Sequence, residues 1–511
     1  MSFKIKQIVN ITSYSTIVMC FITLLSCAQT IVTTKKPTTP KVDKPNIIFI
    51  MLDDLGKEWV ENYGAEEIKT PTIDKLAEEG MQFKNAWSMP QCTPSRVTLL
   101  TGQYPWRHGW INHYDVPRWG HGAQFDPTMN PSFARVMKDA GYKTCAAGKW
   151  QINDFRLQPD AMNLHGFDEY AMWTGAEGGN EKASQKRYWD PYIHTKEGSK
   201  TYEGQFGEDV FTDFIIDFMT KNKENPMMIY YPMCLPHGPL VHTPAEPNVT
   251  DKIDKHKAMV RYTDIILKKI LDSLDDLGIR ENTVIVWTTD NGTAKNIVGK
   301  RNGRAVRGGK TLTTENGVNS PFIVNWKGTI KEGTVTDALV DFSDIFATFS
   351  DLGNGKLPKD YIGDGSSFAP LLRGETADSP RDWIMAMGSK PAKIENGKVT
   401  NVHKFRDRVI RNKKYKVFVD NKKRIHKIVD VVNDLEENTN LIGNRNQEIA
   451  QALGKFQKIV NGLPDTDANP IYKKLEGSLY NVDLDVFKKQ HRPNAKKSNH
   501  SPKPKNIKKK L

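Results

Sequence analysis

Hydrophobic residues form several short, unbroken runs along the chain, and each run has the length of one buried strand. A continuous apolar run of this kind is typical of a strand that is buried on both faces of a parallel sheet. The runs cover residues 46–52, 142–147, 227–233, 283–289 and 321–326.

Amphipathic segments lie between these runs and predict helices. They cover residues 70–79, 131–141 and 254–277. Proline stands near the start of the first two segments and glycine directly follows the third, which are the positions these residues favour at helix ends. Strands that alternate with helices predict an α/β fold with a mostly parallel central sheet sandwiched by helices.

The pattern changes after Gly374, where short, polar, lysine-rich strands and one amphipathic helix are expected. These features predict a smaller C-terminal α+β subdomain over residues 377–487, after a main domain over residues 45–376. Residues 488–511 form a basic tail of low complexity, for which we expect disorder. The expected strands cover residues 409–411, 415–420 and 424–429, and the helix covers residues 447–460.

The charge of the chain is concentrated at its two ends. The formal net charge is +13, of which residues 488–511 contribute +10 and residues 1–44 contribute +5, so residues 45–487 carry −2. A nucleic-acid-binding domain is expected to carry basic patches on its folded surface. The sequence therefore argues against a nucleic acid as the partner of the folded body.

The first residues have the features of an export signal. Lys4 and Lys6 precede a short apolar stretch at residues 17–25, and Leu24-Leu25-Ser26-Cys27 then resembles the lipobox of bacterial lipoproteins. This resemblance predicts a signal peptide over residues 1–27, a lipid anchor to the membrane at Cys27 and a location in the bacterial periplasm or outer membrane. An ordinary signal peptide or a short anchor is the alternative. Residues 28–44, rich in Thr, Lys and Pro, predict a flexible stalk.

Three of the five cysteines lie beyond the signal region, and they are too few for a disulfide framework. Cys145 and Cys234 lie in apolar runs, where a buried, inert thiol is the usual interpretation. Cys92 lies outside such a run and needs another explanation.

Polar residues follow three of the expected strands. Asp53 and Asp54 follow residues 46–52, Lys149 follows residues 142–147, and Asp290 and Asn291 follow residues 283–289. Reactive groups gather beyond the carboxyl ends of strands in open parallel sheets. The four oxygen donors suit Ca²⁺ or Mg²⁺, although an Asp pair after a strand is also a common helix cap.

Cys92 precedes Thr93 and Pro94, so a short helix over residues 94–100 would place its thiol at the positive end of the helix. The amino terminus of a helix lowers the pKa of a thiol placed there. The free backbone N–H groups of the first helical turn can also bind an anion. Arg96, one turn further on, could pair with such an anion. Taken alone, the pattern leaves an activated thiolate and a structural cysteine equally open.

The residues around Cys92 also resemble a known signature. Cys92-Thr93-Pro94-Ser95-Arg96, followed by Leu99-Leu100-Thr101-Gly102, is similar to the motif of the formylglycine-dependent sulfatases of the alkaline-phosphatase-like superfamily. Further segments match the same family in the same order along most of residues 45–374. They are Pro45 to Gly56, Gly141 to Trp150, Pro236-His237-Gly238-Pro239, Thr289-Asp290-Asn291-Gly292, Gly308-Gly309-Lys310 and Asn433 to Leu441.

The resemblance implies a covalent mechanism and assigns a role to each matching residue. A separate maturation enzyme would oxidise Cys92 to Cα-formylglycine, whose hydrate attacks sulfur with one hydroxyl and expels sulfate with the help of the other. Asp53, Asp54, Asp290 and Asn291 would bind one divalent ion, expected to be Ca²⁺, together with the oxygen of the modified Cys92. Arg96 would orient the diol, Lys149 and Lys310 would hold sulfate oxygens, and His237 would protonate the leaving alcohol.

Two positions depart from the family pattern, and one of them is the segment Glu315 to Pro321, which lacks the Arg often found before the Val-Pro pair. Gln151 stands where the family usually has His after Gly148-Lys149-Trp150, and an amide cannot exchange a proton near neutral pH. The departure at Gln151 keeps an inert, lipid-anchored glycan-binding protein open as an alternative. A phosphodiesterase or phosphonate hydrolase of the same superfamily is the other alternative.

The expected substrate is a sulfated carbohydrate, such as an oligosaccharide from the marine algal polysaccharides ulvan or carrageenan. This expectation rests on the lipobox and on the aromatic-rich residues 106–119. Trp110 and Tyr114 in this stretch are candidates for stacking on sugar rings, although aromatic residues more often pack in the core.

Overall fold

The computed structural model describes residues 44–112, 124–153, 155, 158–173, 187–389, 393–395 and 398–472. All of them lie in the unit Asp43–Leu511. The expected signal peptide, the lipid anchor at Cys27, nearly all of the stalk and the basic tail lie outside these residues. Among the described helices, none combines the length and the apolar composition needed to cross a membrane.

The described part of the chain is built on one ten-stranded sheet. Its centre, β8-β1-β7-β3-β4, is parallel throughout, whereas the pairs β8-β11, β11-β2, β4-β5 and β5-β6 are antiparallel. The predicted fold class is confirmed, with a parallel centre and mixed edges. In spatial order the strands are β12 (Thr334–Asp341), β2 (Met81–Trp87), β11 (Phe322–Trp326), β8 (Thr283–Thr289), β1 (Asn46–Leu52), β7 (Met227–Pro232), β3 (Lys143–Lys149), β4 (Glu169–Trp173), β5 (Tyr192–Thr195) and β6 (Gly198–Thr201).

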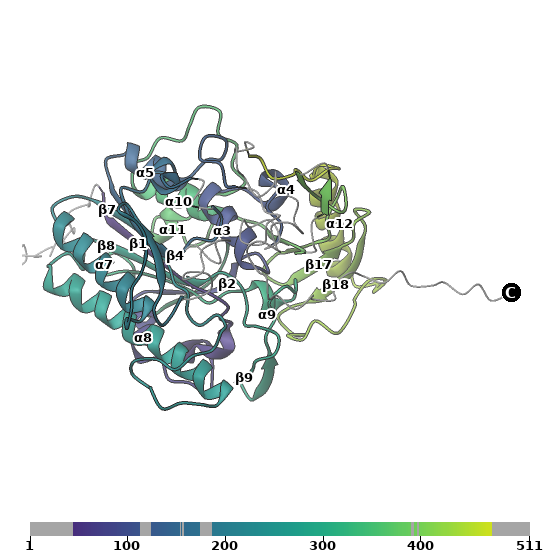
Figure 1. The fold of residues 1–511 in the computed structure, drawn as a ribbon. Helices are drawn as coiled ribbons and strands as arrows, with labels where there is room; N and C mark the ends of the chain where they lie inside the picture. Colours follow the sequence, from purple (N-terminus) through teal and green to yellow (C-terminus); the bar gives the residue numbers. More distant parts are fainter. Residues whose placement is uncertain are drawn as a thin grey trace, which may run out of the picture. The chain divides into compact units, whose positions relative to one another are not determined.

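Strand β1 is buried on both faces because helices cover both sides of the sheet (Figure 1). Ile48, Ile50 and Leu52 pack on one side with α2 (Pro71–Glu78), α7 (Gly207–Asn222) and α8 (Lys252–Asp276). Alternate residues of β1 pack on the other side with α3 (Cys92–Thr101), α5 (Phe133–Asp139), α10 (Asp344–Leu352) and α11 (Ala369–Leu372). The unbroken apolar run of β1 therefore reflects burial from two directions.

A second, four-stranded antiparallel sheet follows the main domain, in the order β13-β16-β17-β18. Helix α12 packs against this sheet through Ile449, Ala452, Phe456 and Val460, in a core that also includes Trp87 at the end of β2. The subdomain is thus joined to the main sheet through a shared apolar core. Its elements are β13 (Ile384–Met387), β14 (Lys393–Glu395), β15 (Lys398–Thr400), β16 (Arg408–Arg411), β17 (Tyr415–Val419), β18 (Ile425–Asp430) and α12 (Gln447–Gly462).

The predicted elements agree with the described ones to within a few residues, and two kinds of difference have a physical cause. Helix α8 begins two residues before the predicted start because the Asp251 side chain accepts hydrogen bonds from Ile253 N and Asp254 N. Strand β11, predicted as one more parallel strand, runs antiparallel to both neighbours. The remaining short elements are β9 (Val298–Arg301), β10 (Arg304–Arg307), α4 (Pro105–His108), α6 (Ala161–Leu164), α9 (Glu315–Val318), η1 (Lys57–Trp59) and η2 (Glu61–Tyr63).

The carboxyl ends of β1, β2, β3, β7 and β8 lie at one edge of the sheet, because all five strands point the same way. Asp53, Asp54, Asp290 and Asn291 directly follow two of these ends, Lys149 is the last residue of β3, and Cys92 and His237 lie five residues beyond β2 and β7. This edge is the place where ligands bind in open α/β sheets.

Candidate active site

Cys92 is the first residue of α3, and only 3% of it is exposed. Every residue of α3 is buried, so the helix amino terminus faces the interior of the site and not solvent. Ser95 fixes this end of the helix, because its hydroxyl donates to the backbone oxygens of Asp290 at 2.5 Å and Met89 at 3.0 Å. The predicted short helix is correct, and it begins at Cys92 itself.

Three cations pair with three carboxylates beside Cys92. Lys149 Nζ lies 2.5 Å from Asp53 Oδ2, and Lys310 Nζ lies 2.6 Å from Asp54 Oδ2. Arg96, which is 1% exposed, places an Nη2 2.7 Å from Asp290 Oδ2 and donates to the backbone oxygen of Lys149 at 3.2 Å. The structure thus brings together residues that lie up to 257 positions apart.

The acidic residues fit a divalent cation with oxygen ligands. One ligand atom each from Asp53, Cys92 and Asp290 lies within 4.8 Å of the others, and the same holds for Asp53, Asp54 and His237. Asp53 Oδ1 and Asn291 Oδ1 are buried without a hydrogen-bond partner in the described part of the chain. Buried oxygens without partners are costly, so a cation would satisfy them.

The pKa values of the carboxyl groups reflect this crowding of charge. Burial opposes ionisation of Asp53, but the charges of Lys149, Arg96 and Lys310 outweigh it and hold its pKa well below the usual range. Burial and the charge on Asp53 raise the pKa of Asp290 to about 7 despite Arg96 and Lys149. Negative charge at Asp290 is therefore incompletely balanced by the protein, as expected of a cation site.

His237 lies on the loop after β7, with its Nε2 3.5 Å from Asp54 Oδ2. The buried Glu208 holds the start of this loop, since its Oε1 accepts from Cys234 N at 2.6 Å and Leu235 N at 3.1 Å. Burial and the charge of Lys310 lower the pKa of His237 to about 3. The imidazole is therefore neutral in the structure, and a nearby substrate anion would favour its protonation.

The backbone is strained at positions next to the site. Asp54, Gln151 and Thr311 have φ angles of 68°, 74° and 71°, which residues other than glycine rarely adopt. Gly148 has φ 122°, and a Cβ atom there would lie 2.1 Å from the backbone oxygen of Pro232. Strain at such positions is typical of sites where the surrounding structure fixes functional groups.

Gln151 faces Cys92, with its Nε2 4.0 Å from the sulfur. Its Oε1 is buried without a hydrogen-bond partner among the described residues. The amide thus occupies a position from which it could contact a group built on Cys92, although it cannot accept a proton near neutral pH.

Arg187 was not recognised from the sequence. Its Nη1 lies 3.2 Å from His237 Nδ1, an atom that also lies 2.6 Å from the Gly238 backbone oxygen. Arg187 follows Lys186 in a polar stretch, which is the usual pattern of a surface loop. No local signal identified it, because it reaches the site only through the tertiary fold.

Trp110 does not offer a surface for sugar stacking, contrary to the expectation from the sequence. Its side chain is fully buried in the core beside Phe125, with ring centroids 5.9 Å apart. Tyr114 lies outside the described residues.

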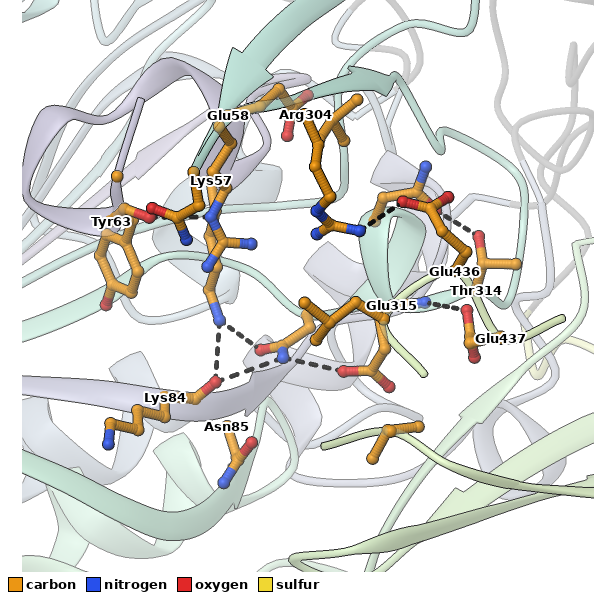
Figure 2. Close-up of a pocket in the computed structure, with 18 of the residues that line it drawn as sticks. Lys57, Glu58, Tyr63, Lys84, Asn85, Arg304, Thr314, Glu315, Glu436 and Glu437 are labelled. Atoms are coloured by element: carbon orange, nitrogen blue, oxygen red, sulfur yellow. Dashed lines mark hydrogen bonds and ion pairs between the residues drawn. The ribbon is translucent and has the colours of Figure 1, made fainter. Parts of the chain in front are cut away.

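The described chain also contains a separate cavity of about 970 Å³ between the β9–β10 hairpin and the C-terminal subdomain (Figure 2). None of the site residues above lines this cavity in the described part of the chain. Most of its acidic side chains pair with cations, so we place the chemistry at the strand ends. The pairs include Glu315–Arg411 at 2.7 Å, Glu436–Arg304 at 2.6 Å and Glu437–Lys416 at 2.7 Å.

Comparison with known proteins agrees with this geometry. A family model described as Sulfatase matches residues 45–355, and one described as N-sulphoglucosamine sulphohydrolase, C-terminal, matches residues 309–461. Among curated proteins, an arylsulfatase of Hemicentrotus pulcherrimus is 31% identical over 64% of this chain and 62% of its own length. The N-acetylgalactosamine-6-sulfatase of Mus musculus is 30% identical over 66% of this chain and 68% of its own length.

A bacterial relative and a solved structure cover more of the chain. The N-acetylgalactosamine-6-O-sulfatase of Bacteroides thetaiotaomicron is 28% identical over 71% of this chain and 82% of its own length. The crystal structure of Ps i-CgsB is 25% identical with a TM-score of 0.68, over 88% of this chain and all of that one. These findings confirm the expected superfamily and enzyme class: the chain belongs to the sulfatase family of sulfuric ester hydrolases.

Proposed function

We propose that this chain hydrolyses sulfate esters of carbohydrates, with a formylglycine derived from Cys92 as nucleophile and one divalent cation, Ca²⁺, as cofactor. The observation that carries the proposal is the placement of Cys92 at the amino terminus of a buried helix. There it meets Asp53 and Asp290 and is surrounded by the cations Arg96, Lys149 and Lys310. This combination suits a nucleophile that must receive an anionic ester.

The cation would be held by Asp53, Asp54, Asp290 and Asn291 together with the modified Cys92, and it would supply charge neutralisation at the ester. Hydrated formylglycine would supply a hydroxyl nucleophile in place of the thiol. Arg96 is fixed by Asp290 and by the Lys149 backbone oxygen, so its guanidinium can orient the group at position 92.

Three further side chains act on the ester. Lys149 and Lys310 carry ammonium groups that can bind sulfate oxygens as charge-assisted donors. His237 directs Nε2 towards Asp54 and the centre of the site, so this nitrogen would deliver the proton to the leaving oxygen. Gln151 would hydrogen-bond to the group at position 92 without exchanging its own protons.

The proposed substrate class is a sulfated carbohydrate, and within it an oligosaccharide of an algal polysaccharide such as carrageenan or ulvan. Two relatives are named as sulfatases of N-acetylgalactosamine 6-sulfate. The protein of the solved neighbour was also crystallised with a neocarrahexaose. These named activities support a sulfated sugar as the natural substrate.

Sulfate release from a panel of sulfated oligosaccharides of defined structure tests the proposal. Protein matured with its modifying enzyme should release sulfate, and the Cys92→Ala variant should release none above background. Peptide mass spectrometry should find formylglycine at position 92. An unmodified thiol in protein that still turns over substrate would contradict the assigned nucleophile.

The competing activity is hydrolysis of phosphate diesters or phosphonates. A phosphonate monoester hydrolase of Agrobacterium radiobacter shares the fold, with a TM-score of 0.60 at 16% identity. Turnover of an aryl sulfate and of an aryl phosphate diester should be compared on the same preparation. A clear preference for the phosphorus ester would replace the sulfatase assignment.

We also propose export and lipid attachment at Cys27 in a bacterial envelope. The support is the lipobox-like sequence at residues 24–27. Labelling with a radioactive fatty acid should mark the native protein and should be lost in a Cys27→Ser variant. Labelling that persists in the variant would contradict this anchor site.

A further inference from the structure

Arg187 is a buried cation that the proposed chemistry does not use. It is 6% exposed, and its guanidinium lies 4.1 Å above the Trp173 ring at the end of β4. Among the described residues it makes no ion pair, and its Nε has no hydrogen-bond partner. A buried charge without an opposite charge is unfavourable, so Arg187 has the properties of a group that awaits an anion.

The position of Arg187 is fixed by its neighbour in the chain. The Tyr188 hydroxyl donates to the backbone oxygens of Cys234 at 2.7 Å and His237 at 2.5 Å. The Tyr188 backbone oxygen accepts from Gly207 N at the start of α7. Arg187 is therefore held against the His237 loop before any ligand arrives, which reduces the entropy lost on binding.

The contact with His237 identifies which part of the substrate Arg187 can reach. Nε2 of His237 faces Asp54 and the reacting centre, whereas Nδ1 faces Arg187. Since His237 would protonate the leaving oxygen, Arg187 lies on the side of the alcohol and not of the transferred sulfate. Two hydrogen bonds, the imidazole ring, the His237–Arg187 contact and the guanidinium group together span at most about 13 Å. An anion at that distance belongs to the same sugar or to its neighbour.

We propose that Arg187 binds a second anionic group of the substrate, a sulfate or carboxylate on the leaving sugar or on the next one. The inference rests on the proposed sulfatase function and specifies its substrate as a sugar with at least two anionic groups. The planar guanidinium matches either anion with paired N–H donors.

Binding to the Cys92→Ala protein tests the proposal without turnover. The probes for calorimetric titration are a disulfated disaccharide, a disaccharide with one sulfate and one uronate, and a monosulfated disaccharide. Adding Arg187→Gln should weaken binding of at least one dianionic probe about 10- to 100-fold, the range for a charge-assisted hydrogen bond. The affinity for the monosulfated probe should change by less than about threefold. The dianionic probe that responds identifies the anion as sulfate or carboxylate.

Arg301→Gln is the matched control, because Arg301 makes no ion pair among the described residues and lines the separate cavity. It should leave all three affinities unchanged. Arg187→Lys keeps the positive charge but lacks the paired N–H donors of the guanidinium. It should weaken binding of the dianionic probe less than Arg187→Gln does, and it replaces Arg187→Gln if that variant does not fold.

The inference would be overturned if Arg187→Gln weakened binding of all three probes equally or of none. It would also be overturned if neither dianionic probe bound at millimolar concentration. Wild-type protein that releases no sulfate while the binding pattern holds would instead refute the proposed function alone. The two failures are therefore distinguishable.

Discussion

Glu315 lies where the C-terminal subdomain meets the main domain, and its replacement by Gln should destabilise the fold. Its Oε2 pairs with Arg411 at 2.7 Å and its Oε1 lies 3.3 Å from Lys416. The side chains of Arg411 and Lys416 are 4% and 0% exposed, so neither can turn to water when the carboxylate is lost. Lys416 keeps Glu437 as a partner at 2.7 Å, but Arg411 is left as a buried charge without its carboxylate, which is destabilising.

The pKa of Glu315 gives the size of the effect. Burial raises this pKa, but Arg411 and Lys416 outweigh burial and lower it from 4.5 to about 2. The difference corresponds to about 3 kcal/mol of stability at neutral pH. Because the folded pKa is depressed, this stability is complete above the unfolded value of 4.5 and is lost as pH falls towards about 2.

Urea unfolding of wild type and Glu315→Gln at two pH values measures the loss of stability at neutral pH and its dependence on pH. The variant should be about 3 kcal/mol less stable at pH 7, and the gap should shrink by about 1.4 kcal/mol at about pH 3.5. Asp337→Asn is the matched control, since Asp337 pairs with Lys413 at 2.9 Å but is 62% exposed. It should change stability by less than about 1 kcal/mol. A gap for Glu315→Gln that stays constant between the two pH values would refute the ion-pair explanation.

Four other outcomes are expected. Lys310→Ala should lower kcat/KM for a sulfate ester about 100- to 1000-fold, measured by sulfate release, with an unchanged circular-dichroism spectrum as the control for folding. Gly148→Ala should lower the free energy of unfolding by more than about 2 kcal/mol, because its Cβ would lie 2.1 Å from the Pro232 oxygen. Gly204 has φ 71° but no atom within 4 Å of an added Cβ, so Gly204→Ala should lower the free energy of unfolding less than Gly148→Ala does in the same assay. A chelator should abolish sulfate release and lower the melting temperature, and added Ca²⁺ should restore both. Gln151→His should add an ionisation to the pH–rate profile below the free imidazole value of about pH 6.5, because the side chain at position 151 is buried and burial lowers an imidazole pKa.

The strands predicted from the sequence are those buried from two sides. Residues 46–52 and 283–289 are apolar throughout because helices cover both faces, and they coincide with β1 and β8. Strand β2 was missed, since Gln82 and Lys84 interrupt its apolar residues and are partly or fully exposed. The direction of β11 was wrong for another reason: an apolar run shows that a strand is buried but not which way it runs.

The candidate site was predictable where its residues follow strands. Asp53 and Asp290 come one residue after β1 and β8, so their place in the sequence sets their place in the fold. Arg187 had no such signal, because contacts between distant segments bring it to His237. The catalytic roles assigned to the site residues stay predictions from the resemblance until variants are assayed.

The packing of β1 also determines where its carboxylates lie. In the β1–β8 ladder Leu52 pairs with Thr289, so Asp53 and Asp290 are the next residues on adjacent strands. Side chains alternate between the faces of a strand, and a slip of one residue would turn Ile48, Ile50 and Leu52 towards the wrong helices. The same slip would separate Asp53 from Asp290. The hydrophobic cores on both faces therefore stabilise the register that brings the acidic side chains together. A β1 mutation that weakens this packing should reduce cation affinity even though it touches none of the proposed ligands.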